Sequence, residues 1–477
     1  MNTFNRREFL KSTFATGVTL AVPFSKILGA NDTLRMGVIG LNGQGAYHVQ
    51  LLNEIAGVRV VALCDVDNEV LAREKKKFDD RGEQIACYVD ARDLLDDQTI
   101  DAVSIATPNH WHALMVIWAC QAGKDVYVEK PASHNIWEGR KMVEAARKYK
   151  RIVQFGAQLR SDVGVMEIFD YLRSGTLGKI KCVRGFCYKR RMSIGKIDGV
   201  GVIPASVDYH LWCGPAMMVP LKRKNLHYDW HWVWNTGNGD IGNQGVHQMD
   251  VCRWLLNETG LPKRVMSFGG RFGYIDDGET ANTQVAILEY DSAPIIFEVR
   301  GLPKTKKDDQ EMDHYRGIRI GEVIQCENGY IAGGGAYDNQ ENRIRQFERT
   351  EGSGHFDNFF QAVRSRKMSD LNGDIEIGHI SSALCHAANI SYRIGEIATG
   401  QKIVDALDNH YDYLDTFSRF QEHLLVNAVD LDQTPRYLGP WLIIDQENER
   451  FVGDYSKEAN MLLTRNYREP FIVPEEV

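Results

Sequence analysis

The stretch GNGDIGNQGVHQMD, residues 237–250, combines a histidine with an amide and a carboxylate at helical spacing. Asn243, His247 and Asp250 stand at i, i+4 and i+7, so a helix would place all three on one side. An imidazole titrates near neutral pH and can take the proton that a hydroxyl group loses. The glycines are also typical of an ordinary turn ahead of a helix, and many histidines are structural. The stretch is therefore a candidate for acid–base chemistry that the rest of the chain must support.

A nucleotide-binding pattern precedes it near the start of the chain. RMGVIG, residues 35–40, predicts a strand that runs into a helix, and Gly40, Gly43 and Gly45 mark the junction, with Asn42 where the usual pattern has its second glycine. A second strand over residues 58–64 ends at Asp65, twenty residues after Gly45. A carboxylate there can accept both ribose hydroxyls of NAD and would repel a 2′-phosphate. Since no arginine follows directly, NAD is favoured over NADP.

Two further apolar runs, DAVSIATP (residues 101–108) and DVYVEKP (125–131), read as strands of the same sheet. Asn109 begins the helix after the first run and can lie beside a pyrophosphate, while Lys130 stands at the end of the second. Alternating strands and helices imply a doubly wound parallel sheet with ligands at the carboxyl ends of its strands. The predicted fold class is α/β, with Lys130 at the binding edge.

Composition limits the class of protein, the number of domains and the kinds of partner. The chain has 477 residues, 43% hydrophobic and 25% charged, with a net charge of −8. This describes a globular protein of two or three domains, and without a basic block nucleic acid is an unlikely partner. The nine cysteines form no CxxC pair and indicate no disulfide framework.

The first thirty residues are typical of a targeting segment. Arg6 and Arg7 precede Phe9, Leu10 and a short apolar stretch broken by Pro23, as in a twin-arginine export signal. The alternative is a frayed amphipathic N-terminus. The signal predicts a periplasmic or otherwise exported protein with no stable membrane span, because the apolar stretch is too short.

The ordered set of motifs resembles the Gfo/Idh/MocA family of oxidoreductases. The glycine turn, CD after the second strand, ATPNxxH, EKP, SGTLGKIKCVRGF (residues 174–186) and the histidine stretch together carry the resemblance, over about residues 33 to 405. It implies a signal (1–30), a Rossmann domain (31–155), a substrate-binding α+β domain with an open, mainly antiparallel sheet (156–405) and a C-terminal extension (406–477). The extension is expected to be a strap over the domains or an oligomer contact, and a homo-oligomer is predicted.

The resemblance also assigns residues. The implied cofactor contacts are Gly40, Asn42, Gly43, Gly45, Asp65, Thr107, Pro108, Asn109, His112, Glu129 and Lys130. In the family a lysine steadies the alkoxide and a histidine takes the hydroxyl proton, which implies these roles for Lys130 and His247. The family's aspartate is Asn243 here, and an amide can orient an imidazole but cannot stabilise its charged form as a carboxylate does. Asp250 or Asp240 is the candidate for the missing charge.

The predicted substrate-binding domain has weaker sequence patterns than the Rossmann domain. IKCVRGFCYK, RVMSFGGRF, TQVAILEY and PIIFEVRG predict strands, and DWHWVW places Trp230, Trp232 and Trp234 on one side of another. Such tryptophans can stack on sugars, although a core role is favoured. Arg160, Trp232 and Asp250 are the candidate substrate contacts, and no histidine spacing indicates a metal site.

Three functions remain open. The first is oxidation of a secondary hydroxyl of a sugar, glycoside or cyclitol by tightly bound NAD. The second is redox-neutral cleavage of a glycoside, in which oxidation, elimination, addition and reduction return the hydride to the same substrate. The third is a non-catalytic binding protein in which NAD is structural.

Overall fold

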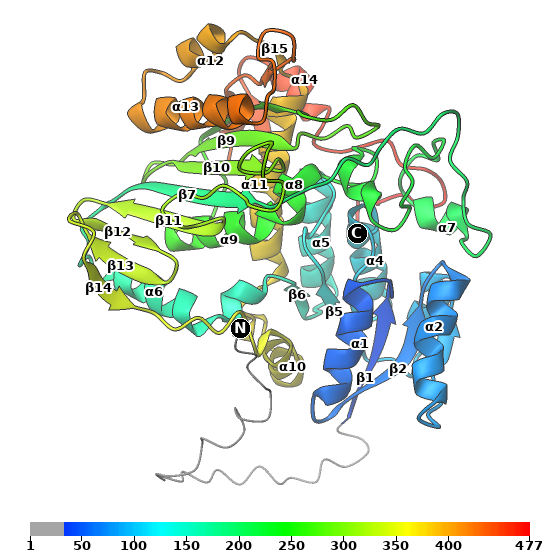
Figure 1. Cartoon of the computed structure of the whole chain (residues 1–477). Coiled ribbons are helices and arrows are strands. Elements are labelled where there is room, and N and C mark those ends of the chain that lie inside the picture. The colour runs from blue at the N-terminus through cyan, green and yellow to red at the C-terminus, as the bar shows by residue number, and fades with distance from the viewer. Residues whose placement is uncertain (1–32) are drawn as a thin grey trace, which may run out of the picture. The chain divides into compact units, whose positions relative to one another are not determined.

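The structure is a computed structural model that describes residues 33–477, so the predicted export signal lies outside the described residues. Figure 1 shows a parallel sheet near the N-terminal end of this range and a larger mixed sheet beyond it. Within residues 33–477, no helix is both long and apolar enough to span a bilayer.

The first sheet has six parallel strands in the order β3-β2-β1-β4-β5-β6, which is the predicted doubly wound arrangement. Its strands are β1 (Leu34–Ile39), β2 (Val58–Cys64), β3 (Ala86–Tyr88), β4 (Ala102–Ile105), β5 (Asp125–Val128) and β6 (Val153–Phe155). Its helices are α1 (Gln44–Glu54), α2 (Asn68–Asp79), α3 (Ala91–Asp96), α4 (Asn109–Gln121) and α5 (Ile136–Lys148). Neither β3 nor β6 was predicted from the sequence, because strands of three residues carry too little pattern. The strand order reverses between β1 and β4, which opens a crevice at their carboxyl ends.

The second sheet has twelve strands and is mostly antiparallel, as the resemblance implied. All four predicted strands are confirmed, as β7 (Ile180–Tyr188), β8 (Arg264–Gly270), β9 (Thr283–Glu289) and β10 (Ile295–Arg300). Only β7 and β10 pair in parallel. The others are β11 (Ile320–Cys326), β12 (Gly329–Ala332), β13 (Gly335–Asp338), β14 (Arg343–Gln346), β15 (Glu396–Ile397), β16 (Tyr437–Leu438), β17 (Leu442–Asp445) and β18 (Arg450–Val452).

Helices cover both faces of this sheet. Along β9, Ala286 and Leu288 pack into the core shared with the Rossmann helices, and Val285 and Ile287 pack into a separate core with α13 (Tyr411–Val426). The alternation follows from the two-residue period of a strand. The inner face is covered by α9 (Gly245–Leu255) and α11 (Ile375–Arg393), and α11 also packs on α5. The remaining helices are α6 (Val163–Arg173), α7 (Tyr209–Cys213), α8 (Gly239–Asn243), α10 (His355–Ser365), α12 (Gly400–Ala406) and α14 (Ser456–Asn460).

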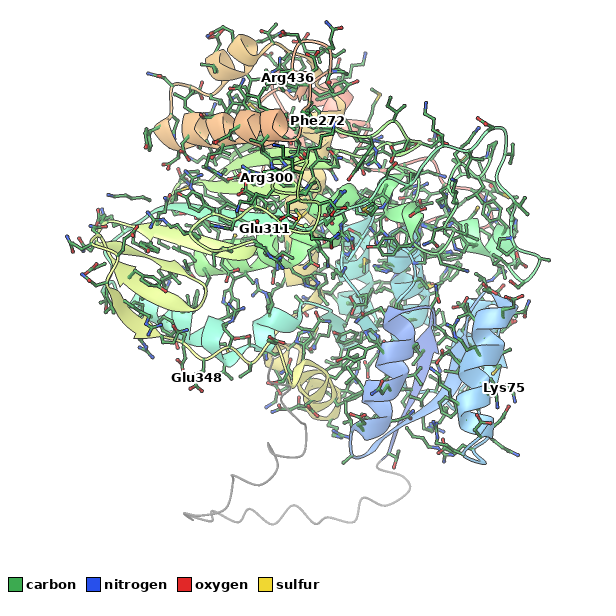
Figure 2. All side chains as sticks on the ribbon, in the orientation of Figure 1. Lys75, Phe272, Arg300, Glu311, Glu348 and Arg436 are labelled. Atoms are coloured by element: carbon green, nitrogen blue, oxygen red, sulfur yellow. The ribbon has the colours of Figure 1, made fainter. Side chains whose placement is uncertain are left out.

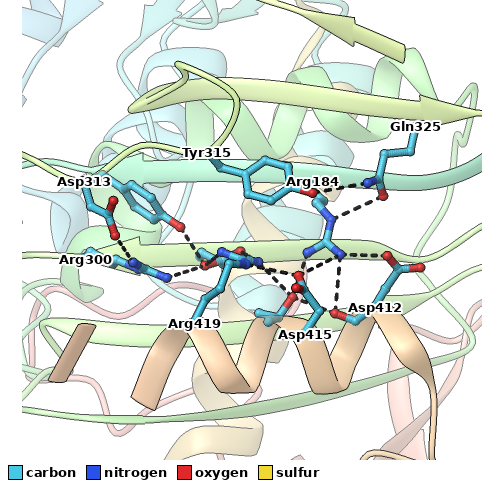
Figure 3. Close-up of polar contacts among 11 residues, drawn as sticks. Arg184, Arg300, Asp313, Tyr315, Gln325, Asp412, Asp415 and Arg419 are labelled. Atoms are coloured by element: carbon cyan, nitrogen blue, oxygen red, sulfur yellow. Dashed lines mark hydrogen bonds and ion pairs between the residues drawn. The ribbon is translucent and has the colours of Figure 1, made fainter. Parts of the chain in front are cut away.

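A buried charge network joins α13 to the sheet (Figure 3). Arg419 of α13 donates to both oxygens of Glu298 on β10, at 2.6 and 3.0 Å, and Tyr188 of β7 donates to the same carboxylate at 2.6 Å. Arg184 of β7 donates to Asp412 Oδ1 at 2.7 Å. Figure 2 shows the contrast between Arg300 of this interior and Lys75 on the exposed side of α2. The network holds the C-terminal extension on the sheet.

The end of the chain returns to the Rossmann domain. Phe471 is fully buried, with its ring centroid 5.3 Å from that of Trp111 and 6.4 Å from that of Trp118, both on α4. Tyr467 donates to Glu138 of α5 at 3.0 Å. The extension therefore contacts helices α4 and α5 of the Rossmann domain as well as the second sheet.

The tryptophan stretch corrects one prediction. DWHW, Asp229–Trp232, forms a 3-10 helix rather than a strand. A 3-10 helix has three residues per turn, so alternate tryptophans do not share a face. Trp230 and Trp232 are both buried, in keeping with the favoured core role.

Candidate active site

The glycine turn after β1 has the geometry of a nucleotide cradle. Gly40 has φ +82° and Gly43 φ +73°, a region that side chains rarely adopt. A Cβ on Gly45 would stand 1.6 Å from the Gly40 carbonyl oxygen, so only glycine permits this tight turn. A Cβ on Gly43 would meet nothing within 4 Å, which leaves its backbone open to the cavity that it lines. These features fit a pyrophosphate at the start of α1.

Asp65 stands at the end of β2 and is held by the backbone. Its Oδ2 accepts from Leu41 N at 2.7 Å and its Oδ1 from Asp67 N at 2.9 Å. Burial raises its pKa, and the two N–H donors oppose that shift. Asp65 and Asn42 both line the main cavity. The fixed carboxylate fits the predicted contact with ribose hydroxyls.

The loop after β4 forms another wall. Thr107, Pro108 and Asn109 line the cavity, and Asn109 Nδ2 donates to Asn238 Oδ1 at 2.9 Å. His112 is not part of the lining. Its ring nitrogens lie 2.8 Å from the carbonyl oxygen of Thr107 and 2.7 Å from that of Pro131. It therefore joins two loops of the site rather than facing the cavity.

Glu129 holds three polar side chains together at the site. Its Oε1 accepts from Gln44 Nε2 at 3.3 Å and Gln158 Nε2 at 3.2 Å, and lies 3.1 Å from His48 Nε2. Burial alone would raise its pKa, but the His48 contact and the charge of Lys130 lower the pKa to about 2. The carboxylate is thus ionised at neutral pH. The sequence analysis missed His48, because 81 residues separate it from Glu129.

Lys130 and Asn243 are in direct contact. Lys130 Nζ donates to the backbone oxygen and to Oδ1 of Asn243, each at 3.2 Å. Burial lowers the pKa of Lys130, while Glu129 and Asp240 oppose the shift. Asn243 therefore positions the ammonium group. No hydrogen bond between Asn243 and the His247 ring is found among residues 33–477.

His247 lies at the cavity wall one turn into α9. Burial, followed by the charge of Lys130, lowers the pKa of the imidazole to about 4. The ring is therefore neutral at pH 7 and can accept a proton. Its side chain makes no hydrogen bond within the described range, which leaves both ring nitrogens available to a ligand.

The candidate carboxylates have other partners. Asp250 Oδ2 lies 2.8 Å from Arg160 Nε, and Asp240 Oδ1 lies 2.6 Å from Arg191 Nη2. Neither carboxylate bonds to His247, and Arg160 and Asp250 are absent from the described lining of the cavity. The same holds for Trp232, which is 4% exposed with Arg191 over its ring at 5.2 Å. The structure thus brings Lys130, Asn243 and His247 together but does not bring Arg160, Trp232 and Asp250 to the cavity wall.

The cavity measures about 810 Å³ and extends from Asp65 to His247. One side is formed by Asn225, His227, Tyr228, Trp230 and His231, of which only Trp230 and His231 lie in a stretch with a predicted structure. The segment contacts the Rossmann domain through His227, whose Nε2 lies 2.8 Å from Asp67 Oδ2. The earlier coil residue Ser206 accepts from Asn68 N at 2.9 Å. The aromatic content of the segment was the only sequence feature that could have indicated this wall, because coil segments have no periodic pattern.

The arrangement suits dinucleotide-dependent proton and hydride chemistry. The glycine turn and Asp65 fit one end of a dinucleotide, and the Lys130 ammonium and the His247 imidazole stand in the same cavity. A neutral base and a cation together can take a hydroxyl proton and stabilise the oxygen left behind.

The known proteins that this chain resembles include NAD-binding oxidoreductases, as the geometry of the site suggests. Residues 34–157 match GFO_IDH_MocA, the "Oxidoreductase family, NAD-binding Rossmann fold". Residues 163–268 match GFO_IDH_MocA_C2, the "Oxidoreductase family, C-terminal alpha/beta domain". An inositol 2-dehydrogenase of Salmonella paratyphi B is 33% identical over 229 residues, which are 47% of this chain and 55% of the relative. A glycosyl hydrolase family 109 protein of Shewanella is 30% identical over 205 residues, 38% of this chain and 45% of the relative.

The chain thus spans about half the length of these curated relatives. Among solved structures, the WlbA dehydrogenase from Bordetella pertussis, in complex with NADH and UDP-GlcNAcA, has a TM-score of 0.56 at 20% identity, covering 76% of this chain and 97% of that one. That identity shows a shared fold alone. Residues 34–268 thus match the two successive domain models of the Gfo/Idh/MocA oxidoreductase family, and the first of these models is an NAD-binding Rossmann fold.

Proposed function

We propose that this protein is an NAD-dependent oxidoreductase that acts on a secondary hydroxyl of a sugar, glycoside or cyclitol. The observation that carries the proposal is the shared cavity, which Lys130 and His247 line together with Asp65 and the glycine turn. The inositol 2-dehydrogenase relatives support a polyhydroxylated substrate.

Each residue at the cavity would have a separate role in the reaction. NAD, when bound along the cavity, would accept a hydride from the substrate carbon. His247 is neutral and free of other partners, so its ring would take the hydroxyl proton. Lys130, oriented by Asn243 at 3.2 Å, would stabilise the developing alkoxide. Trp230, His231 and the rest of the segment 225–231 would exclude water from that end of the cavity.

Tight retention of NAD is part of the proposal. His227 contacts Asp67, two residues after the predicted ribose contact Asp65, and this contact would have to open before the cofactor could leave. A held cofactor favours the second candidate, redox-neutral glycoside cleavage, because the hydride then returns within one site. The glycosyl hydrolase family 109 relative supports that candidate. Free access to Lys130 and His247 argues against a non-catalytic binding protein.

The decisive experiment is turnover by gel-filtered protein without added nicotinamide. Cyclitols, free sugars and aryl glycosides are supplied, and NADH absorbance, ketosugar and released aglycone are measured. A released aglycone without net NADH indicates the cleavage reaction. Strict dependence on free NAD with stoichiometric NADH indicates an ordinary dehydrogenase. No product from any class, with NAD bound, contradicts the enzymatic proposal. The variants Lys130→Met and His247→Ala should each lower turnover about 10²-fold.

Export by the twin-arginine route remains a proposal that rests on Arg6 and Arg7. Replacement of both by lysine should retain the protein in the cytosol, as measured by fractionation, and unchanged export would contradict it. Homo-oligomerisation also stays a prediction, which light scattering on the purified protein tests.

A further inference from the structure

The active-site cavity has a second imidazole besides His247, and the proposed reaction gives it no chemical step. His231 lines the same cavity and follows Trp230 in the 3-10 helix Asp229–Trp232. A polar side chain on the wall of a cavity can fix the orientation of a ligand as well as exclude water. The contacts of the His231 ring show which of its nitrogens is available and what that nitrogen can bind.

Neighbouring side chains hold the His231 ring in one orientation. The ring stacks on that of Trp230, with centroids 3.6 Å apart and an interplanar angle of 21°. The Tyr228 ring is also close, with its centroid 4.9 Å from that of His231. Arg191 holds Tyr228 in turn, since its Nη1 donates to the Tyr228 hydroxyl at 2.9 Å. A side chain that packing holds in place loses little conformational entropy when it binds a ligand.

The hydrogen bond of the His231 ring determines its tautomer. Nδ1 lies 2.6 Å from the carbonyl oxygen of Tyr228. Because a carbonyl oxygen can only accept, Nδ1 carries the proton, and Nε2 of the neutral ring has a free lone pair. Nε2 has no hydrogen-bond partner within residues 33–477. Gln248 Oε1 in the same lining is unpaired and buried, whereas His231 Nε2 keeps accessible surface. The structure therefore leaves one acceptor of known polarity open to a ligand.

The electrostatics of the cavity keep this ring neutral. Burial, followed by the charges of Lys130 and Arg191, lowers the pKa of His231 to about 3, against the opposite effect of the Tyr228 carbonyl. The ring is thus close enough to Lys130 to be affected by its charge. At neutral pH the cavity has two neutral imidazoles, those of His231 and His247, together with one ammonium group.

We propose that His231 determines substrate specificity by accepting a hydrogen bond from a second hydroxyl of the substrate, while His247 and Lys130 act on the hydroxyl that is oxidised. This inference rests on the proposed function and narrows it to substrates with at least two free hydroxyls. A hydroxyl has a proton to donate to Nε2, whereas a ketone, an ether or a carboxylate presents only lone pairs, which Nε2 repels. A substrate without the second hydroxyl leaves Nε2 unpaired, and sites of this kind discriminate against the deoxy analogue.

The test is a binding measurement with probes that differ by one hydroxyl. The full-length, NAD-saturated protein is titrated in a calorimeter with cyclohexanol and with 1,2-, 1,3- and 1,4-cyclohexanediol. At least one diol should bind about 10-fold or more tightly than cyclohexanol, because only a diol can contact Lys130 and His231 together. Equal affinities for cyclohexanol and all three diols, or no detectable binding of any diol, would overturn the proposal.

His231→Phe keeps a ring beside Trp230 but removes Nε2. It should reduce the preference for the diol to about 2-fold or less and leave the affinity for cyclohexanol unchanged. His210→Phe is the matched control and should keep the preference, since His210 contacts Arg468 and is absent from the described lining of the cavity. A preference that survives in His231→Phe would contradict the proposal. Lys130→Met should weaken cyclohexanol and the diol alike, and unchanged diol binding in that variant would place the diol outside the active site and also contradict it.

Nitrogen-15 NMR of the unaltered protein tests the same contact without a substitution. At neutral pH His231 should carry its proton on Nδ1, and the resonance of its unprotonated Nε2 should shift when the diol is added. A proton on Nε2, or a resonance that does not move, would overturn the proposal. Both measurements record binding rather than turnover. A protein that prefers the diol but shows no turnover contradicts the proposed reaction and not the role of His231 in binding. One that oxidises its substrate without any diol preference contradicts the role of His231 alone.

Discussion

At the scale of single residues, the site depends on how burial and one neighbouring charge tune His247. Burial lowers its pKa first and Lys130 second, to about 4. The neutral imidazole is the form that accepts a proton, so activity is expected to be constant above that pH and to fall below it. Asn243, in place of a carboxylate, contacts the ammonium group of Lys130 at 3.2 Å without adding a negative charge.

This predicts a shift in the pH–rate profile. In Lys130→Met the pKa of His247 should rise, because the repelling charge is gone, and the acid limb of kcat/KM should move to higher pH while the maximal rate falls about 10²-fold. Lys189→Met is the control, since Lys189 makes a smaller contribution and donates to Gln244 at 2.9 Å. An acid limb that stays in place in Lys130→Met would contradict His247 as the titrating base.

Cofactor choice is a second prediction at this scale. Asp65→Asn keeps an oxygen for the backbone donors of Leu41 and Asp67 but removes the negative charge. The ratio of NAD to NADP affinity should therefore fall about 10-fold or more, because the 2′-phosphate is no longer repelled. Equilibrium binding of both dinucleotides measures this. A ratio equal to that of the unaltered protein would show that Asp65 does not discriminate.

At the scale of elements, α13 is held on the large sheet by the charge network in Figure 3. Glu298 is 1% exposed and paired with Arg419 and Arg300. Burial alone would raise its pKa, but these cations lower it to about 2. A carboxyl group whose pKa is lowered by folding stabilises the folded state at pH values above its pKa in the unfolded chain. That stabilisation is lost as the pH falls toward 2.

Glu298→Gln should therefore lower the free energy of unfolding at pH 7 by about 3 kcal/mol, because Arg419 and Arg300 lose their shared buried carboxylate and keep only Asp415 and Asp313. The difference between variant and unaltered protein should shrink as pH falls from about 4.5 toward 2. Urea unfolding at several pH values measures both effects. The control is Glu83→Gln, whose exposed pair with Arg81 should contribute little. Equal effects of the two substitutions would mean that the network does not stabilise α13.

At the scale of the whole described chain, the last residues connect the extension to the Rossmann domain. Phe471 is fully buried against Trp111 and Trp118, whereas its neighbour Ile472 is 45% exposed. The docking of the tail thus contributes to the stability of the described chain.

Phe471→Ala should lower the free energy of unfolding by about 3–5 kcal/mol, as expected for a large aromatic side chain removed from a core. Ile472→Ala, one residue along, should change it by about 0.5 kcal/mol or less. Urea denaturation compares the two variants directly. Similar losses for both would show that the tail is not docked as described.

The sequence by itself predicted four of the six strands of the parallel sheet, its glycine turn, and the places of Asp65 and Lys130 at strand ends, because strand periodicity and turn chemistry are local and the carboxyl ends of parallel strands meet at one edge. The roles of Lys130 and His247 followed from the family resemblance. The sequence also predicted the four strands β7 to β10. Only the tertiary structure decided that Asn243 contacts Lys130, that Asp250 pairs with Arg160, and that His48 supports Glu129. These partners are at least 81 residues apart in the chain, and their choice depends on packing between elements. The 3-10 helix at Asp229–Trp232 likewise lies among coil segments, which have no period from which their position could be predicted.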